Sequence, residues 1–272
     1  MPRSDLVEEP GRRIGARSPV AEPLSVARLR RLWQPRRDSY ARMHLYESFR
    51  IRIHRALTWL ERAESMEEPA ELDARFLCQM IGMRALSERW EASSAAPAAA
   101  PESMRLFLDQ LLSHDQHLLI PQLLMEQRSL VQTIFADRYV DAFAWERWVR
   151  LGESPGPAGA PATRGTASTR RASAAARAAA AAGRERSVAF DVRGAMAAGR
   201  WDEVLRRLMA RVAFVHAQLE HGGAACGSRQ NRAAVRRASL MLEHLAPVAL
   251  QVMIDHGYGD EWGEPCFMPP AR

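Results

Sequence analysis

Apolar residues recur at steps of three and four along most of the chain, which is the period of an amphipathic helix. The clearest case is 39–64, where Phe49, Ile53 and Leu60 share one face. The same period predicts further helices, and no segment shows the strict alternation of a strand. The predicted helices span 70–90, 102–112, 118–135 with a break at Pro121, 139–149, 190–198, 201–221 and 230–256. The pattern therefore predicts an all-α fold.

Two segments lack this period. Residues 1–37 contain five prolines among many charges, and only 24–33 could form a helix there. Residues 152–186 contain no apolar side chain larger than Ala, so they cannot bury enough area to offset the entropy lost on ordering. We expect a mostly disordered N-terminal arm at 1–37 and a disordered internal insert at 152–186. The insert then separates two folded parts, 38–151 and 187–267.

The basic charge of the chain is concentrated in these two segments. The formal net charge is +6, a sign that is typical of proteins binding nucleic acid or an acidic membrane surface. The arm carries nine Arg against four acidic residues, and residues 153–186 carry six Arg against two. Together they carry +9, so the remainder carries −3. All 38 basic residues are Arg in an Ala-rich chain, which favours codon usage over a dedicated nucleic-acid tail as the explanation.

The cysteines and the lengths of the apolar runs indicate the cellular compartment of the protein. Cys78, Cys226 and Cys266 are far apart and form no CxxC pair, which is typical of a protein in a reducing compartment. The N-terminus lacks the apolar run of a secretory signal, and no stretch approaches the ~18 uncharged apolar residues that span a bilayer. We therefore expect a cytoplasmic protein with no membrane partner.

The segment FVHAQLEHGG at 214–223 is the best candidate for chemistry. It places His216 and His221 five residues apart at the end of a predicted helix, just before two glycines. The negative end of the helix dipole favours a protonated imidazole at His221. Such an imidazole can donate a proton to a leaving oxygen or bind a phosphate.

Several segments of the chain resemble the HEPN superfamily of small α-helical bundles, many of which are metal-independent endoribonucleases. RIHRALTWLERAE at 52–64 resembles the first helix of a bacterial subgroup, and DARFL at 73–77 resembles the start of its second. QLEHGGA at 218–224 resembles the end of the catalytic helix, NRAAVR at 231–236 the next helix, and WGEPC at 262–266 the terminal stretch. The resemblance implies one HEPN-like bundle, in which 152–186 is a lengthened loop.

The resemblance also implies where chemistry would occur. The family's signature is Arg, four to six residues and then His, and two protomers bring these residues together in a dimer groove. There the Arg neutralises phosphate, and the His assists attack by the 2′-hydroxyl of RNA. His221 matches the signature His, but His216 stands at the Arg position. Because an imidazole does not reproduce the bidentate clamp of a guanidinium, this departure argues against an active enzyme.

His221 and His216 are the candidate catalytic residues, and the candidate contacts to RNA phosphate are Arg211, Arg229, Arg232 and Arg236. Arg211 and His216 by themselves form a shifted Arg-x4-His motif. His216, His221 and Cys226 lack a fourth ligand for zinc, so we predict no metal and no cofactor. Arg52 and Arg55 on the first helix are interpreted as part of a solvated face.

Two functional hypotheses remain open. The first is an RNA-associated HEPN-like homodimer with a degenerate endoribonuclease motif. The second is a non-catalytic helical scaffold that dimerises or binds a partner.

Overall fold

Helices form nearly all the regular structure, as the hydrophobic pattern predicts. The structure is a computed structural model, and it describes residues 24–94, 96–142, 190–223, 225–227, 229, 231–259 and 262–267. The expected insert at 152–186, residues 1–23 of the expected arm and most of the helix expected at 139–149 lie outside these ranges. The prediction of a predominantly helical fold is confirmed for the ranges given.

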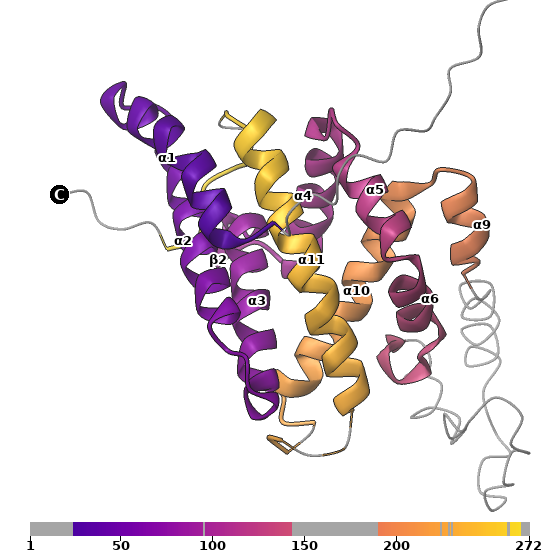
Figure 1. Ribbon diagram of the computed structural model, residues 1–272. Helices are drawn as coiled ribbons and strands as arrows, with labels where there is room; N and C mark the ends of the chain where they lie inside the picture. Colours follow the sequence, from indigo (N-terminus) through magenta and orange to yellow (C-terminus); the bar gives the residue numbers. More distant parts are fainter. Residues whose placement is uncertain are drawn as a thin grey trace, which may run out of the picture.

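One side of the bundle is built from the first helices and the last one. α1 (Val26–Arg42) packs on α2 (Glu47–Glu64), and α2 packs along α3 (Leu72–Ser87), which follows the 3-10 turn η1 (Pro69–Glu71). α3 also packs against α11 (Arg232–His256). Figure 1 shows α11, in yellow, between α3 and the helices of the other side.

The other side is built from the middle of the chain, and its helices also reach α11. α10 packs against α4, α6 and α9, while α4, α5 and α6 each pack against α11. The elements are α4 (Ala100–His114), α5 (Leu119–Glu126), α6 (Arg128–Ala136), η2 (Arg138–Val140), α9 (Val192–Ala197) and α10 (Trp201–Glu220).

The buried apolar residues of both sides form one continuous core. α11 supplies its centre, and Leu242, Leu245 and Leu250 are all fully buried. Helices encoded before and after the insert therefore share a single core. No described helix combines the length with the apolar character that crossing a bilayer requires.

In the described part of the predicted arm, the helix that the sequence allowed at 24–33 forms, and the disorder predicted for 34–37 is wrong. Residues 26–37 lie in α1, which follows a Ser25 cap and buries Val26, Leu29 and Trp33 in the core. The backbone N–H of Val26 donates to the Glu64 carboxylate at 2.8 Å, which ties α1 to the end of α2. This helix extends to Arg42, beyond the range that its apolar residues suggested.

Two predicted helix boundaries also differ from the observed ones. The helix expected over 39–64 is divided, because His44 and Tyr46 both adopt positive φ angles of 54° between α1 and α2. Pro121 does not break a helix, since it lies in the first turn of α5, where no intrahelical N–H is needed. The break falls instead at Gln127, between α5 and α6.

A small strand pair, which the sequence pattern did not predict, follows α3. β1 (Trp90–Glu91) and β2 (Ala96–Pro97) pair antiparallel, with Trp90 opposite Pro97. Two residues a strand are too few to show alternation.

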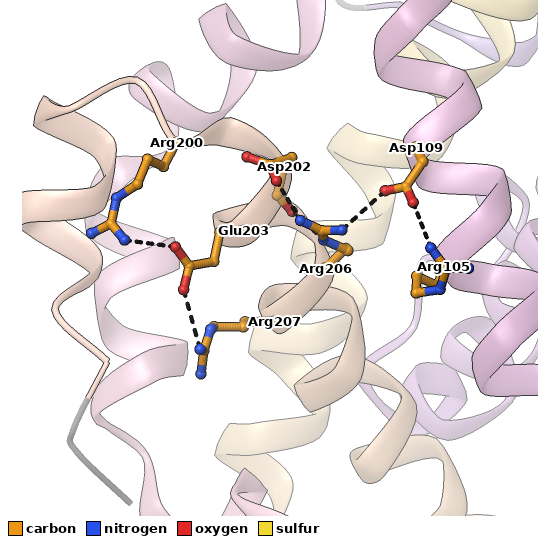
Figure 2. Close-up of polar contacts among 7 residues, drawn as sticks. All are labelled: Arg105, Asp109, Arg200, Asp202, Glu203, Arg206 and Arg207. Carbon is orange, nitrogen blue, oxygen red and sulfur yellow. Dashed lines mark hydrogen bonds and ion pairs between the residues drawn. The ribbon is translucent and has the colours of Figure 1, made fainter. Parts of the chain in front are cut away.

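A network of ion pairs joins α4 to the start of α10 (Figure 2). Arg206 of α10 meets the Asp109 carboxylate of α4 at 3.3 Å and also binds Asp202 one turn before it. The network comprises Arg105, Asp109, Arg200, Asp202, Glu203, Arg206 and Arg207. The pair between Arg206 and Asp109 links α10 to α4, whereas Glu203 meets Arg200 and Arg207 at the start of α10.

Candidate functional site at the α10–α11 junction

α10 ends where the sequence predicts it to end. His221 follows its last residue, and Gly222 adopts a left-handed φ of 68°, which glycine reaches without steric cost. The N–H of Gly223 then donates to the Gln218 carbonyl at 2.6 Å. A Cβ atom at Gly223 would lie only 2.8 Å from that carbonyl oxygen, so the tight turn needs glycine at this position.

The structure places His216 inside the bundle. Its side chain is 7 % exposed, and its ring lies 6.4 Å from that of Phe76 on α3. Its Nδ1 atom is 3.3 Å from a Glu220 carboxylate oxygen. Burial, followed by the nearby Arg84 charge, lowers the pKa of His216 despite the opposing effect of Glu220. His216 is therefore a buried core residue that favours the neutral imidazole, and it is not presented to a ligand.

His221 has the opposite environment. It is exposed at the end of α10, and Arg229 and Arg236 are also exposed where the chain enters α11. The two histidines of the predicted motif therefore differ in accessibility, because the turn of α10 between them carries the chain from the core to the surface.

Arg211 holds α10 to the turn that follows α6. Its guanidinium meets the Asp141 carboxylate at 2.8 Å and donates to the Asp137 carbonyl at 3.3 Å. The same group stacks over the Phe135 ring at 5.0 Å. The Arg211 side chain is only 16 % exposed, so the shifted Arg-x4-His motif presents neither its Arg nor its His.

Arg232 forms a bidentate ion pair with Asp73 of α3. Its two terminal nitrogens lie 2.8 and 3.1 Å from the two carboxylate oxygens, and the Gly227 N–H donates to the same carboxylate at 2.9 Å. Burial by itself would raise the pKa of Asp73, but the hydrogen bonds from Gly227 and Arg232 outweigh it and lower that pKa. Asp73 therefore fixes the α10–α11 loop on the start of α3.

The sequence interpretation missed the acidic partners of these arginines. Asp73 opens the DARFL segment of the family resemblance, and its place in the first turn of a helix was the only signal available. Asp141 and Asp137 follow α6 and have no periodic pattern that links them to α10. Arg237 also meets Asp137, at 2.6 Å. Two of the predicted phosphate contacts, Arg211 and Arg232, therefore already have carboxylate partners.

Polar side chains connect the two ends of the loop between α10 and α11. The Asn231 side-chain amide donates to the Gln218 side-chain oxygen Oε1 at 2.7 Å, and the Gln218 side-chain nitrogen Nε2 donates to the Tyr139 backbone carbonyl at 2.9 Å. Asn231 adopts a left-handed φ of 56°, which short polar side chains tolerate. The entry to α11 is thus attached to the end of α10.

The cavity between α6, α10 and α11 is small. A cavity of about 10 Å³ lies between α6, α10 and α11, with Asp137, Arg211 and Arg237 among its lining residues. That volume is about enough for one water molecule and far below the space that a nucleotide occupies. His221, Arg229 and Arg236 lie outside this cavity and are exposed on the surface.

The described ranges contain no group of three His, Cys, Asp or Glu side chains that could hold a metal ion. Comparison with protein-family models, with curated proteins and with solved structures finds no match to this chain.

Proposed function

We propose that this protein is a non-catalytic, HEPN-like helical scaffold that binds a partner and has lost the family's phosphate chemistry. One observation carries the proposal: the residue at the signature Arg position, His216, is buried, and its pKa is lowered. A neutral buried imidazole offers no positive charge to a phosphate, whereas the reaction that the HEPN resemblance implies needs a guanidinium there.

The state of the neighbouring arginines supports the same proposal. Arg211 and Arg232 are the cations that could replace the missing Arg, and both are paired with carboxylates. Transferring either to a phosphate would break its ion pair with Asp141 or with Asp73. Such a change costs about 1–3 kcal/mol for a hydrogen-bonded charged group. The scaffold hypothesis is therefore favoured over catalysis.

A second candidate function is RNA association without cleavage. It is favoured by His221, Arg229 and Arg236, which are exposed at the same end of the bundle. Guanidinium groups on a surface can position a phosphate backbone without reading its bases. We propose this as the form of RNA binding that the junction could support, in a monomer or a homodimer.

RNA cleavage tests the scaffold hypothesis directly. Wild type and His221→Ala are incubated with structured and unstructured RNA, and the products are separated on a denaturing gel. We expect no cleavage by either protein. Cleavage that wild type performs and His221→Ala does not would disprove the scaffold hypothesis, whereas equal cleavage by both would point to a contaminating nuclease.

RNA affinity tests the second candidate. The double variant Arg229→Ala/Arg236→Ala is compared with a control, Arg31→Ala/Arg42→Ala, which removes two exposed arginines of α1. If the junction binds RNA, only the first variant should bind more weakly and show a shallower dependence of affinity on salt. Equal affinities and slopes for the two variants would exclude the junction as the binding surface.

A further inference from the structure

Two histidine rings meet where α4 and α11 end. His117 lies in the turn between α4 and α5, and His256 is the last residue of α11. Their ring centroids are 5.0 Å apart, with the ring planes tilted by 52°. Figure 1 shows the ends of α4 and α11 at the same end of the bundle. The contact therefore joins residues distant in sequence, and neither histidine belongs to the α10–α11 junction.

The turn that contains His117 is held in place by its own backbone and by Asp115. The buried Asp115 carboxylate accepts the backbone N–H groups of Leu119 and Ile120, both at 2.8 Å. Leu118 adopts a left-handed φ of 54°, and its N–H donates to the Asp115 carbonyl at 3.1 Å. Groups that the fold already positions lose little entropy when they bind a ligand. The backbone at His117 is therefore fixed before a ligand binds.

The end of α11 is fixed from the side of α1. Arg36 of α1 donates to the Ile254 carbonyl and to the Asp255 carboxylate, the latter at 3.1 Å. Asp255, the neighbour of His256 in sequence, therefore already has a partner on α1.

A ring nitrogen of His256 has no partner of its own. His256 is half-buried, and its Nε2 atom is buried without a hydrogen-bond partner among the described residues. A metal ion satisfies the lone pair of such a nitrogen, and histidine is the commonest protein ligand for metal ions. His117 is exposed, so its ring can rotate and admit an ion between the two histidines.

The separation of the two rings fits chelation of one ion. A metal bonded to imidazole nitrogens at about 2.0–2.1 Å holds two ring centroids about 4.5–5.2 Å apart, for bond angles of about 90–110°. The observed separation of 5.0 Å lies within this range. Binding therefore requires rotation of side chains and no displacement of helices.

The helix ends at this place favour a positive ion. α4 ends at His114 and α11 ends at His256, so the negative ends of two helix dipoles meet beside the pair. α5 begins nearby with its positive end, but the Asp115 carboxylate accepts the N–H groups of its first two residues. The backbone therefore adds to the attraction of the two imidazoles for a cation.

We propose that His117 and His256 bind one divalent ion of a late first-row transition metal, such as Ni²⁺ or Zn²⁺, with water completing its coordination. Imidazole nitrogens select this class of ion over Mg²⁺ and Ca²⁺, which take oxygen ligands. Structural zinc sites have four protein ligands, so an ion held by two exchanges with solution. While bound, it links the α4–α5 turn to the end of α11 and stabilises that end of the bundle. This inference does not rest on the proposed function.

Isothermal titration of the full chain with NiCl₂ tests the site, on protein purified without a histidine tag. We expect one ion per chain, and His117→Gln should weaken binding at least tenfold. His54→Gln is the matched control, because His54 is exposed on α2, and it should leave the affinity unchanged. MgCl₂ should give no binding under the same conditions. Equal Ni²⁺ affinities for wild type and His117→Gln would overturn the proposal.

Nuclear magnetic resonance of the histidine rings gives a second readout, which does not depend on stability. On addition of ZnCl₂, the ring signals of His117 and His256 should shift while those of the other histidines stay unchanged. The Tm of wild type should rise by about 5 °C at a hundredfold excess of Zn²⁺ over its Kd, whereas the Tm of His117→Gln should not. Shifts confined to His216 or His221, or binding that leaves every histidine ring unshifted, would overturn the proposal.

Discussion

Asp73 and Arg232 join the first turn of α3 to the first turn of α11 across 159 residues of sequence, with both carboxylate oxygens bound. Asp73→Ala should lower the free energy of unfolding by about 3 kcal/mol, because it leaves a part-buried guanidinium without its partner. Urea denaturation at neutral pH measures this loss. Asp38→Ala, which removes an exposed carboxylate paired with the adjacent Arg37, should change stability by less than about 0.5 kcal/mol.

The ion pair of Asp73 and Arg232 should also make the free energy of unfolding depend on pH in the acidic range. The pKa of Asp73 is lowered in the fold, so its contribution is present at neutral pH. It is lost as the pH falls below the usual carboxyl value of 3.8 and through the lower value in the fold, because the unfolded chain binds the proton first. The stability difference between wild type and Asp73→Ala should therefore shrink below about pH 4.

His216 should produce a second, separate dependence on pH. Its pKa is lowered by burial, so the unfolded chain binds a proton at a higher pH than the folded protein does. Stability should be unaffected by this group above about pH 6.5, should fall as the pH decreases below that value, and should level off below the folded pKa. His216→Phe should remove this part of the slope in denaturation curves recorded from pH 7.5 to 5. Parallel curves for the two proteins would contradict a buried neutral imidazole.

Arg52→Lys tests the hydrogen bonds that Arg52 donates to carbonyls at the end of α3 and in residues 262–263, which together form a carbonyl clamp. A lysine keeps the charge but has one nitrogen, which cannot reach both the carbonyls at the end of α3 and those of residues 262–263. We expect a loss of about 3 kcal/mol or more in the free energy of unfolding, since a buried cation and several carbonyls lose partners. Arg62→Lys is the matched control, because Arg62 is exposed on the same helix. Similar losses for both substitutions would argue against the clamp.

Gly222→Ala tests the end of α10. Gly222 has a left-handed φ of 68°, and a Cβ atom there would meet nothing within 4 Å, so the cost is confined to the backbone. We expect a loss of about 1 kcal/mol for Gly222→Ala. Gly222→Asn should cost less, because Asn tolerates this conformation. Thermal unfolding of the two variants would show whether this order holds.

Arg206 tests the network between α4 and α10. Arg206→Met removes its contacts with Asp109 and Asp202, which are about one-third and one-half exposed. Exposed pairs contribute little, so we expect a loss of about 1 kcal/mol or less at low salt. The loss should become smaller in 1 M NaCl because salt screens exposed charges. A double-mutant cycle with Asp109→Ala would isolate the contact between helices.

The helical fold could be predicted because its information is local. The apolar stripe of α2 and the glycines after α10 locate these elements without any knowledge of their neighbours. The split between α1 and α2 could not be found in this way, since His44 and Tyr46 carry no signal for the positive φ angles that they adopt.

The candidate site was predictable only in part, because its character depends on contacts distant in sequence. His216 and His221 are equivalent in the motif, but only the packing of α10 on α3 shows that one is buried. The sequence predicts a solvated Arg52, yet its side chain is fully buried, and two of its acceptor carbonyls lie more than 200 residues away. The charge on a long side chain does not show whether its partner is water or a distant carbonyl.

The contact between Arg52 and the Trp262 carbonyl also has a consequence for the order of folding. The two residues are 210 positions apart, and closing so long a loop must lose chain entropy before the contact gives any stability. Helix pairs close in sequence, such as α2 with α3, can therefore dock early, and we expect residues 262–267 to dock after them. We expect a late kinetic phase in refolding that Trp262→Ala abolishes, while the formation of helix stays fast. During that phase the guanidinium of Arg52 is exposed, so the newly formed bundle passes through a brief state that is most open to other chains.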